Sequence, residues 1–190
     1  NSVSDQPRQP KAAAGDEPTA QRESADVQRR RADVVAVLAE TLVEVLEWYV
    51  KHEAQRPHVL LYGDAGSEHG ASGAQVITYG DLLLQARRVA TGLVSRGLLP
   101  RQAVALMLPT GRDYLTSFFG VMLAGGIPVP IYPPARLGQI EDHLRRHARI
   151  LANAEAVFII TVPAAKGVAA LLRAEAPTLT DILTPAELDS

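Results

Sequence analysis

The stretch Ala103–Arg136 reads AVALMLPTGRDYLTSFFGVMLAGGIPVPIYPPAR, and it decides the fold of this 190-residue chain. Residues 103–108 form a short apolar run that is typical of a strand buried on both faces. A Pro-Thr-Gly turn follows, then an apolar helical segment that ends at a glycine pair, and residues 127–132 return as a second strand. The crossover is long enough for a parallel return, so the stretch predicts one right-handed βαβ unit.

The two ends of the predicted helix carry recognisable signals. Thr110 and Asp113 are three residues apart and have the pattern of a capping box that opens the helix. Gly125 and Gly126 are expected to end the helix, because glycine supplies the left-handed residue that a helix C-terminus favours. Ligands of parallel sheets usually lie at the loops after the strand C-termini, here residues 109–111 and 133–136.

Two prolines predict how the second strand of the unit pairs. Pro128 and Pro130 are two residues apart, so they direct their backbone toward the same side, and both lack an N–H. Pairing on that side would lose two ladder hydrogen bonds. We therefore expect this strand to pair through Ile127, Val129 and Ile131, and to be an edge or a gapped neighbour on its other side.

Composition and charge limit the function classes. The chain is 47% hydrophobic and 21% charged, which is typical of a soluble globular protein, and its net charge of −2 argues against a protein built mainly to bind nucleic acid. It has no cysteine, which excludes disulfides and thiol nucleophiles and fits a reducing, cytoplasmic location. The longest apolar run, Phe118–Tyr132, is interrupted by glycines and prolines and is shorter than the roughly 20 residues of a membrane span.

The chain is predicted to divide into a disordered tail or linker at residues 1–25 and an α/β subdomain at residues 26–190. The first segment carries three prolines among polar residues and cannot bury enough apolar surface to offset its ordering entropy. The sequence begins with Asn1 rather than Met and ends at Ser190 within a new βα unit. We therefore expect a piece of a longer protein, truncated at its C-terminus.

Hydrophobic periodicity predicts the remaining elements. Helices are expected at residues 26–55 (one helix, or two that meet near Glu40), 78–96, 139–152 and 163–175, with a further helix start at 184–187. Strands are expected at residues 59–62, 76–78, 156–161 and 178–183, with a glycine-rich connection at 63–74. Thr41 with Glu44 and Thr78 with Asp81 are further capping-box patterns. This alternation predicts a layered helix–sheet–helix fold with a mainly parallel sheet.

A search for catalytic constellations finds none that is complete. Nucleophile-elbow, Walker-type and dinucleotide-type glycine patterns are absent from the sequence. His143 and His147 have the spacing of a two-histidine metal site, but no third ligand is evident, so we interpret them as partly exposed helix histidines and assign no metal ligand. A basic face that attracts a phosphate or an acidic partner is the alternative to a solvated face. It would comprise His143, His147, Arg136, Arg145, Arg146 and Arg149.

Residues 77–82 (ITYGDL) and 123–130 (LAGGIPVP) resemble the first and second core motifs of the adenylate-forming, or acyl-activating, enzymes. The extra Pro128 departs from the second motif and leaves it recognisable. The resemblance implies that this chain is the N-terminal subdomain of the adenylate-forming fold, and that the motif residues are chiefly structural. Those residues are Thr78, Tyr79, Asp81, Leu82, Gly125, Gly126 and Pro130.

Four further runs are most similar to the fatty acyl-AMP ligases and the long-chain fatty acyl-CoA ligases. They are residues 56–58, 106–114, 127–136 and 139–154. The resemblance covers about residues 41–188 and implies activation of a fatty acid with ATP and Mg²⁺. The acyl group would then pass to an acyl carrier protein or to CoA. The family's phosphate loop, its later motifs and its C-terminal lysine lie downstream of the second motif and do not occur here, so the chain alone is expected to be inactive.

Two functions stay open on the sequence. The first is the N-terminal portion of a fatty acid-activating ligase, which works with the remainder of the same polypeptide. The alternative is a standalone, non-catalytic binding or interaction module on the same scaffold. If this chain contacts substrate, the candidates lie in two loops at strand ends, although turn and cap roles alone would explain them equally well. These candidates are Tyr132, Pro133, Pro134 and Arg136 in one loop and Thr110 and Gly111 in the other.

Overall fold

The computed structural model describes residues 39–62, 74–132 and 140–189, and the side chains of all of these except residues 140–144. The described residues from Glu40 onward belong to one compact unit. The predicted tail at residues 1–25 and the glycine-rich connection at residues 63–73 lie outside the described residues, as does the first part of the helix predicted at 26–55.

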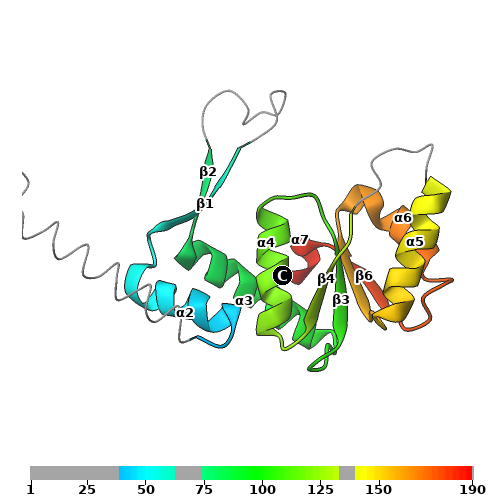
Figure 1. Ribbon diagram of the computed structural model, residues 1–190, viewed down its shortest axis with the longest axis horizontal. Helices are drawn as coiled ribbons and strands as arrows, with labels where there is room; N and C mark the ends of the chain where they lie inside the picture. Colours follow the sequence, from blue (N-terminus) through cyan, green and yellow to red (C-terminus); the bar gives the residue numbers. More distant parts are fainter. Residues whose placement is uncertain (1–38, 63–73, 133–139, 190) are drawn as a thin grey trace, which may run out of the picture. The chain divides into compact units, whose positions relative to one another are not determined.

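A four-stranded sheet with the order β4-β3-β5-β6 organises this unit (Figure 1). Its strands are β3 (Ala103–Met107), β4 (Ile127–Pro130), β5 (Phe158–Thr161) and β6 (Asp181–Leu183). All three strand pairs are parallel, which confirms the predicted mainly parallel sheet and the βαβ unit that β3, α4 and β4 form at one side of it. Every residue of β3 and β5 is buried, as the continuous apolar runs predict.

Helices cover both faces of the sheet (Figure 1). One layer contains α3 (Tyr79–Ser95), α4 (Arg112–Leu123) and the short α7 (Pro185–Leu188). The other contains α5 (Ile140–Asn153) and α6 (Lys166–Leu172), which follows the 3₁₀ turn η2 (Pro163–Ala165). The first core lies between the sheet and the α3 layer, and the second core lies between the sheet and the α5 layer. Because side chains alternate along a strand, Val104 and Leu106 of β3 belong to the first core, whereas Ala105 and Met107 belong to the second.

A smaller third core joins α2 (Leu42–Glu53) to a two-stranded antiparallel sheet of β1 (Pro57–Leu61) and β2 (Gln75–Thr78). Leu46, Ile77 and Leu82 are its buried centre. The predicted capping box of Thr41 and Glu44 forms with both of its hydrogen bonds, so α2 begins where the sequence indicates.

The start of α4 corrects one prediction. Gly111, not Thr110, is the N-cap residue, with an extended backbone (φ 173°) and no side-chain capping bond. Asp113 is therefore the second residue of the helix rather than the third, and a capping box requires the acidic residue at the third position. The predicted box between Thr110 and Asp113 does not form.

The two glycines at the end of α4 have different structural roles. Gly125 alone is left-handed (φ 77°), and its N–H donates to the Met122 carbonyl at 2.9 Å. Gly126 instead permits a close approach, because a Cβ there would lie 3.0 Å from Val121 Cγ1 and 3.2 Å from the Gln102 carbonyl oxygen. Only one of the two glycines therefore supplies the left-handed residue.

The pairing predicted for the proline-containing strand is confirmed. Within the described sheet β4 is an edge strand and pairs only with β3. The N–H of Ile127 donates to the Gln102 carbonyl at 2.9 Å, and that of Ile131 donates to the Leu106 carbonyl at 3.0 Å. Pro128 and Pro130 alternate with these donors and therefore direct their missing N–H groups away from β3.

The other predicted elements form with shifted ends. The helix predicted at 163–175 begins as a 3₁₀ turn and ends at Leu172, and the strand predicted at 178–183 begins at Asp181. The helix start predicted at residues 184–187 forms a complete capping box.

Candidate functional site at the carboxyl edge of the sheet

The predicted substrate-contacting residues that the structure describes lie at one edge of the sheet. Thr110 and Gly111 follow the carboxyl end of β3, and Tyr132 follows that of β4. Because β3 and β4 are parallel neighbours, their carboxyl ends meet at the same edge, where ligands of such sheets bind. The other candidates, Pro133, Pro134 and Arg136, lie outside the described residues.

Of the three described candidates, Thr110 and Tyr132 are exposed and Gly111 is half-buried. The Tyr132 side chain is 84% exposed, and among the described residues no side-chain hydrogen bond involves Tyr132 or Thr110. A Cβ added to Gly111 would meet nothing nearer than the Pro109 carbonyl oxygen at 3.9 Å. This part of the edge is therefore open to a ligand or to another protein segment.

A buried hydroxyl fixes the centre of the same edge. Thr161, the last residue of β5, is fully buried, and its Oγ1 donates to the Met107 carbonyl at 3.0 Å. This bond ties the carboxyl ends of β5 and β3 together beyond the strand ladder. The only sequence signal for it was a threonine at the end of an otherwise apolar run.

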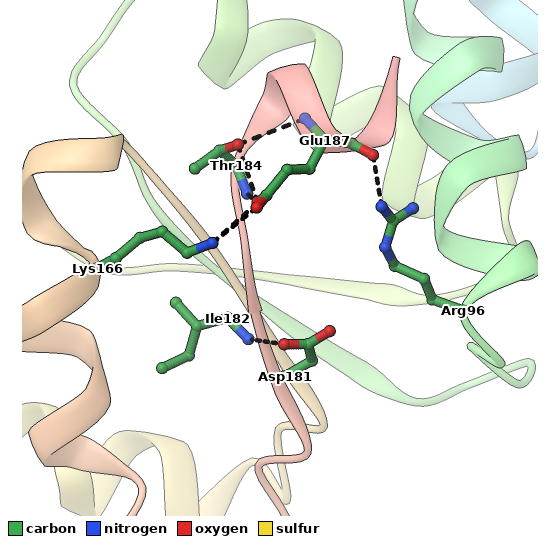
Figure 2. A network of polar contacts seen from close by, with 6 residues as sticks. All are labelled: Arg96, Lys166, Asp181, Ile182, Thr184 and Glu187. Carbon is green, nitrogen blue, oxygen red and sulfur yellow. Dashed lines mark hydrogen bonds and ion pairs between the residues drawn. The ribbon is translucent and has the colours of Figure 1, made fainter. Parts of the chain in front are cut away.

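A polar network surrounds the end of β6 and the start of α7 (Figure 2). Glu187 Oε2 accepts from the Thr184 N–H at 2.7 Å and from Thr184 Oγ1 at 3.0 Å, and the Glu187 N–H donates back to Thr184 Oγ1 at 3.4 Å. Lys166 Nζ of α6 contacts both Glu187 carboxylate oxygens, at 2.8 and 3.0 Å. Arg96, just beyond α3, donates from Nη2 to the Glu187 carbonyl at 2.6 Å.

This network clamps helices rather than providing acid–base chemistry. The hydrogen bond from Lys166, with those from Thr184, lowers the pKa of the Glu187 carboxyl to about 2. Glu187 is therefore ionised at neutral pH and already occupied by donors. Because α6 and α3 lie on opposite faces of the sheet, the network links the two helix layers around the end of β6.

Residues of the first motif hold α3 against the antiparallel pair of strands. Thr78 Oγ1 accepts from the Asp81 N–H at 3.1 Å and caps α3, so only one of the two hydrogen bonds of the predicted capping box forms. The Tyr79 ring stacks on Tyr49 (centroids 4.4 Å apart) and on His58 (4.2 Å apart). Burial, and then the neighbouring Tyr49, raises the pKa of the Tyr79 hydroxyl. These contacts give the motif a packing role, and Leu82 is fully buried beneath it.

The histidine prediction on α5 is wrong for His147. That side chain is only 4% exposed and lies on the inner side of α5, next to Ala148 and Leu151 of the second core. It is therefore neither a partly exposed helix histidine nor part of a basic face. Its spacing from Leu151, four residues later, was the available signal for burial. His143 and Arg136 lie outside the described side chains.

The described residues offer no metal centre: among them, no three His, Asp or Glu side chains lie close enough together to hold an ion. A pocket of about 240 Å³ lies between α3, α4 and α7, and Arg88 and Asp189 line it and form an ion pair at 3.4 Å. Its volume is below the roughly 300–1,000 Å³ of typical ligand pockets, and a second hollow of about 370 Å³ along α3 is shallow and open to solvent. The described part of the chain thus supplies an open edge rather than an enclosed active site.

The layered α/β fold has an open carboxyl edge beside a parallel βαβ unit, which is where ligands of such sheets bind. A family model described as AMP-binding enzyme matches residues 46–189, and the chain belongs to that family.

Individual relatives agree with this assignment. The chain is 38% identical over 93 residues to pyochelin synthetase PchE of Pseudomonas aeruginosa, covering 47% of this chain and 6% of that protein. It is 34% identical over 74 residues to the long-chain-fatty-acid–AMP ligase FadD32 of Mycobacterium marinum, covering 39% of this chain and 11% of that protein.

The fold agrees as well. A solved structure from work on fatty acyl-adenylate ligases of E. coli and L. pneumophila superposes with a TM-score of 0.67 at 23% identity. The superposition covers 78% of this chain and 25% of that chain, and at this identity it establishes the fold alone. The chain therefore corresponds to a small part of the length of the proteins that it matches. Of the helices in the described residues, none has the length and apolar character needed to span a membrane.

Proposed function

We propose that this chain is the N-terminal scaffold of an ATP-dependent ligase that activates a fatty acid in the cytoplasm. The observation that carries the proposal is the AMP-binding match over residues 46–189, on a parallel sheet whose carboxyl edge is open. The fatty acid is favoured because FadD32 is named as a long-chain-fatty-acid–AMP ligase. Because the chain also matches PchE, which is named as a pyochelin synthetase, the class of acid is the first property to test.

The proposed reaction has two steps. A carboxylate oxygen of the acid attacks the α-phosphorus of ATP, which forms an acyl-adenylate and releases pyrophosphate. The thiol of an acyl carrier protein's phosphopantetheine, or of CoA, then attacks the acyl carbonyl and releases AMP. The first step needs charge stabilisation on the phosphates, which Mg²⁺ provides in such reactions. The described residues contain no cluster of ligands for that ion, so we assign them no part in holding it. We expect the chain alone to be inactive because the family's phosphate loop and later motifs do not occur in its sequence.

The role proposed for this scaffold is to present two loops to the substrate. Thr110 after β3 and Tyr132 after β4 are exposed, and Gly111 is half-buried, at the edge where the acid or the nucleotide would bind. Pro133, Pro134 and Arg136 complete the proposed loop.

ATP–pyrophosphate exchange tests the proposal. The 190-residue chain should give no exchange, and a longer polypeptide that contains it and a downstream phosphate loop should give exchange that depends on long-chain fatty acids. Exchange driven only by aryl or amino acids would contradict the fatty acid assignment. A longer polypeptide inactive with every acid class would contradict the ligase and favour the binding module.

The substrate loop can be tested in the active ligase with a matched pair of tyrosines. Tyr132→Ala should raise the KM for the acid or for ATP by about tenfold, the effect of losing one good contact. Tyr62→Ala is the control, because Tyr62 is 78% exposed at the end of β1 and belongs to the small antiparallel sheet. Equal KM values for the two variants would show that Tyr132 does not contact the acid or ATP.

A further inference from the structure

The outer side of α5 presents an arginine face, defined here as Arg145, Arg146 and Arg149. All three side chains are exposed, and helical geometry places them within a sector of about 100°. No hydrogen bond or ion pair links them to any other described residue. Glu141 and Asp142, one turn earlier, have side chains outside the described set. Exposed ion pairs four residues apart are in any case worth only a few tenths of a kcal/mol, so they would leave the arginines available.

The packing of α5 fixes the direction of this face. Ala148 and Leu151, on the opposite side of the helix, are 2% and 0% exposed in the second core. Burial of His147 on the same inner side means that the helix cannot rotate without exposing its core residues. The three guanidinium groups are therefore held outward on a rigid support, whereas the chain as a whole carries a net charge of −2.

The chemistry of the face favours an acidic protein over a membrane. Guanidinium groups bind carboxylates through two parallel hydrogen bonds, and three of them on adjacent turns match a row of carboxylates on a partner helix. A helix that binds a membrane surface presents an apolar side to the lipid, whereas the apolar side of α5 is buried against the sheet. Three arginines without apolar insertion give only weak attraction to anionic lipid.

We propose that the arginine face of α5 docks an acidic helix of the acyl carrier protein that receives the activated acyl group. This proposal rests on the proposed function and specifies its acceptor as a protein rather than free CoA. The geometry is suitable because α5 follows β4 and leads into β5, and so runs antiparallel to the strands. Its N-terminal half, with Arg145 and Arg146, thus lies toward the carboxyl edge where the acyl-adenylate would form.

Binding of purified apo acyl carrier protein to the 190-residue chain, measured by calorimetry at low and high salt, tests the inference. The variant Arg145→Gln/Arg149→Gln should raise Kd by about tenfold and flatten the salt dependence. The matched control Arg87→Gln/Arg101→Gln removes the same charge from exposed positions on and after α3, and should leave Kd unchanged. Far-UV circular dichroism of all variants checks that the fold is retained.

Two parallel measurements separate the alternatives. Sedimentation with phosphatidylcholine vesicles, with and without phosphatidylglycerol, should show no arginine-dependent binding, and CoA should not compete with the carrier. Equal Kd values for the two double variants, absence of carrier binding, or vesicle binding lost only in the α5 variant would each overturn the inference. Pyrophosphate exchange by the longer polypeptide reports on the proposed function separately. Exchange without α5-dependent docking would reject this inference alone, and docking without exchange would reject the ligase alone.

Discussion

The contact between α3 and α4 depends on a glycine, and replacing that glycine should measurably weaken the fold. Gly120 of α4 lies directly against α3: a Cβ at this position would be 2.6 Å from Val89 Cγ1, 2.7 Å from Val89 Cβ and 3.0 Å from the Ala86 carbonyl oxygen. Rotation of the valine would relieve only the first contact, because the other two involve Cβ and the backbone. The helices must therefore separate to accept even one methyl group.

The expected magnitude combines two opposing effects of Gly120→Ala. Overpacking of a filled core costs about 1–3 kcal/mol, whereas alanine in a helix interior gains about 1 kcal/mol over glycine. Because two of the three contacts involve a Cβ and the backbone, we place the overpacking cost at about 2–3 kcal/mol, and we expect the free energy of unfolding to fall by about 1–2 kcal/mol. Gly167→Ala is the matched control, since Gly167 lies in α6 with nothing within 4 Å of the added Cβ. That variant should gain up to about 0.5 kcal/mol, because the position is near the helix start.

Urea unfolding followed by far-UV circular dichroism measures both variants. The fluorescence of Trp48, the single tryptophan of the chain, reports separately on α2. Adding Val89→Ala to Gly120→Ala should recover part of the loss, with a coupling energy of about 1 kcal/mol or more in a double-mutant cycle. A Gly120→Ala variant as stable as the parent chain, or a cycle with no coupling, would refute the close-approach reasoning.

Three further predictions concern single polar groups. Ser117 Oγ is fully buried and has no hydrogen-bond partner among the described residues. Ser117→Ala should therefore raise the free energy of unfolding in urea by about 1 kcal/mol, and a lower value would contradict this prediction. Because the pKa of Glu187 is lowered from 4.5 to about 2, its pairing with Lys166 stabilises the fold above pH 4.5, and that stability is lost as the pH falls toward 2. The pair is half exposed, so Glu187→Gln should flatten the acid unfolding profile by about 1 kcal/mol or less, and an unchanged profile would count against the clamp. Burial, and then Arg56, lowers the pKa of His58 below 6.5. The contribution of His58 to the free energy of unfolding should therefore be full above pH 6.5 and decline as the pH falls through the lower folded-state pKa. His58→Phe should keep the ring stack on Tyr79 and remove this decline.

The parallel pairing of β3 with β4 was within reach of the sequence because its signals are local. The apolar run of β3, the length of the crossover and the two prolines of β4 together indicate a parallel pair with a blocked side. The capping-box pattern was correct in full at Thr41 and in part at Thr78, where only the bond to the Asp81 N–H forms. The pattern misled at Thr110, where the following glycine took the cap position and shifted the register by one residue.

The contacts that hold the layers together were beyond the sequence. Arg96 and Glu187 are 91 residues apart, and nothing local marks either residue as the partner of the other. His147 illustrates the same limit at short range, since its charge-rich neighbours obscured the apolar spacing that places it inside. For the candidate site, sequence reasoning located the strand ends at the carboxyl edge, but not the buried bond from Thr161 that fixes that edge.

The two prolines of β4 have a consequence for how a larger protein could be assembled on this scaffold. On its outer side β4 offers carbonyl acceptors at Pro128 and Pro130 but no matching N–H donors, so an incoming strand would find half of a ladder. Growth of the sheet is thereby directed to the opposite margin, at β6. During synthesis, when N-terminal segments fold before later ones exist, such one-sided growth would keep nascent chains from joining through β4.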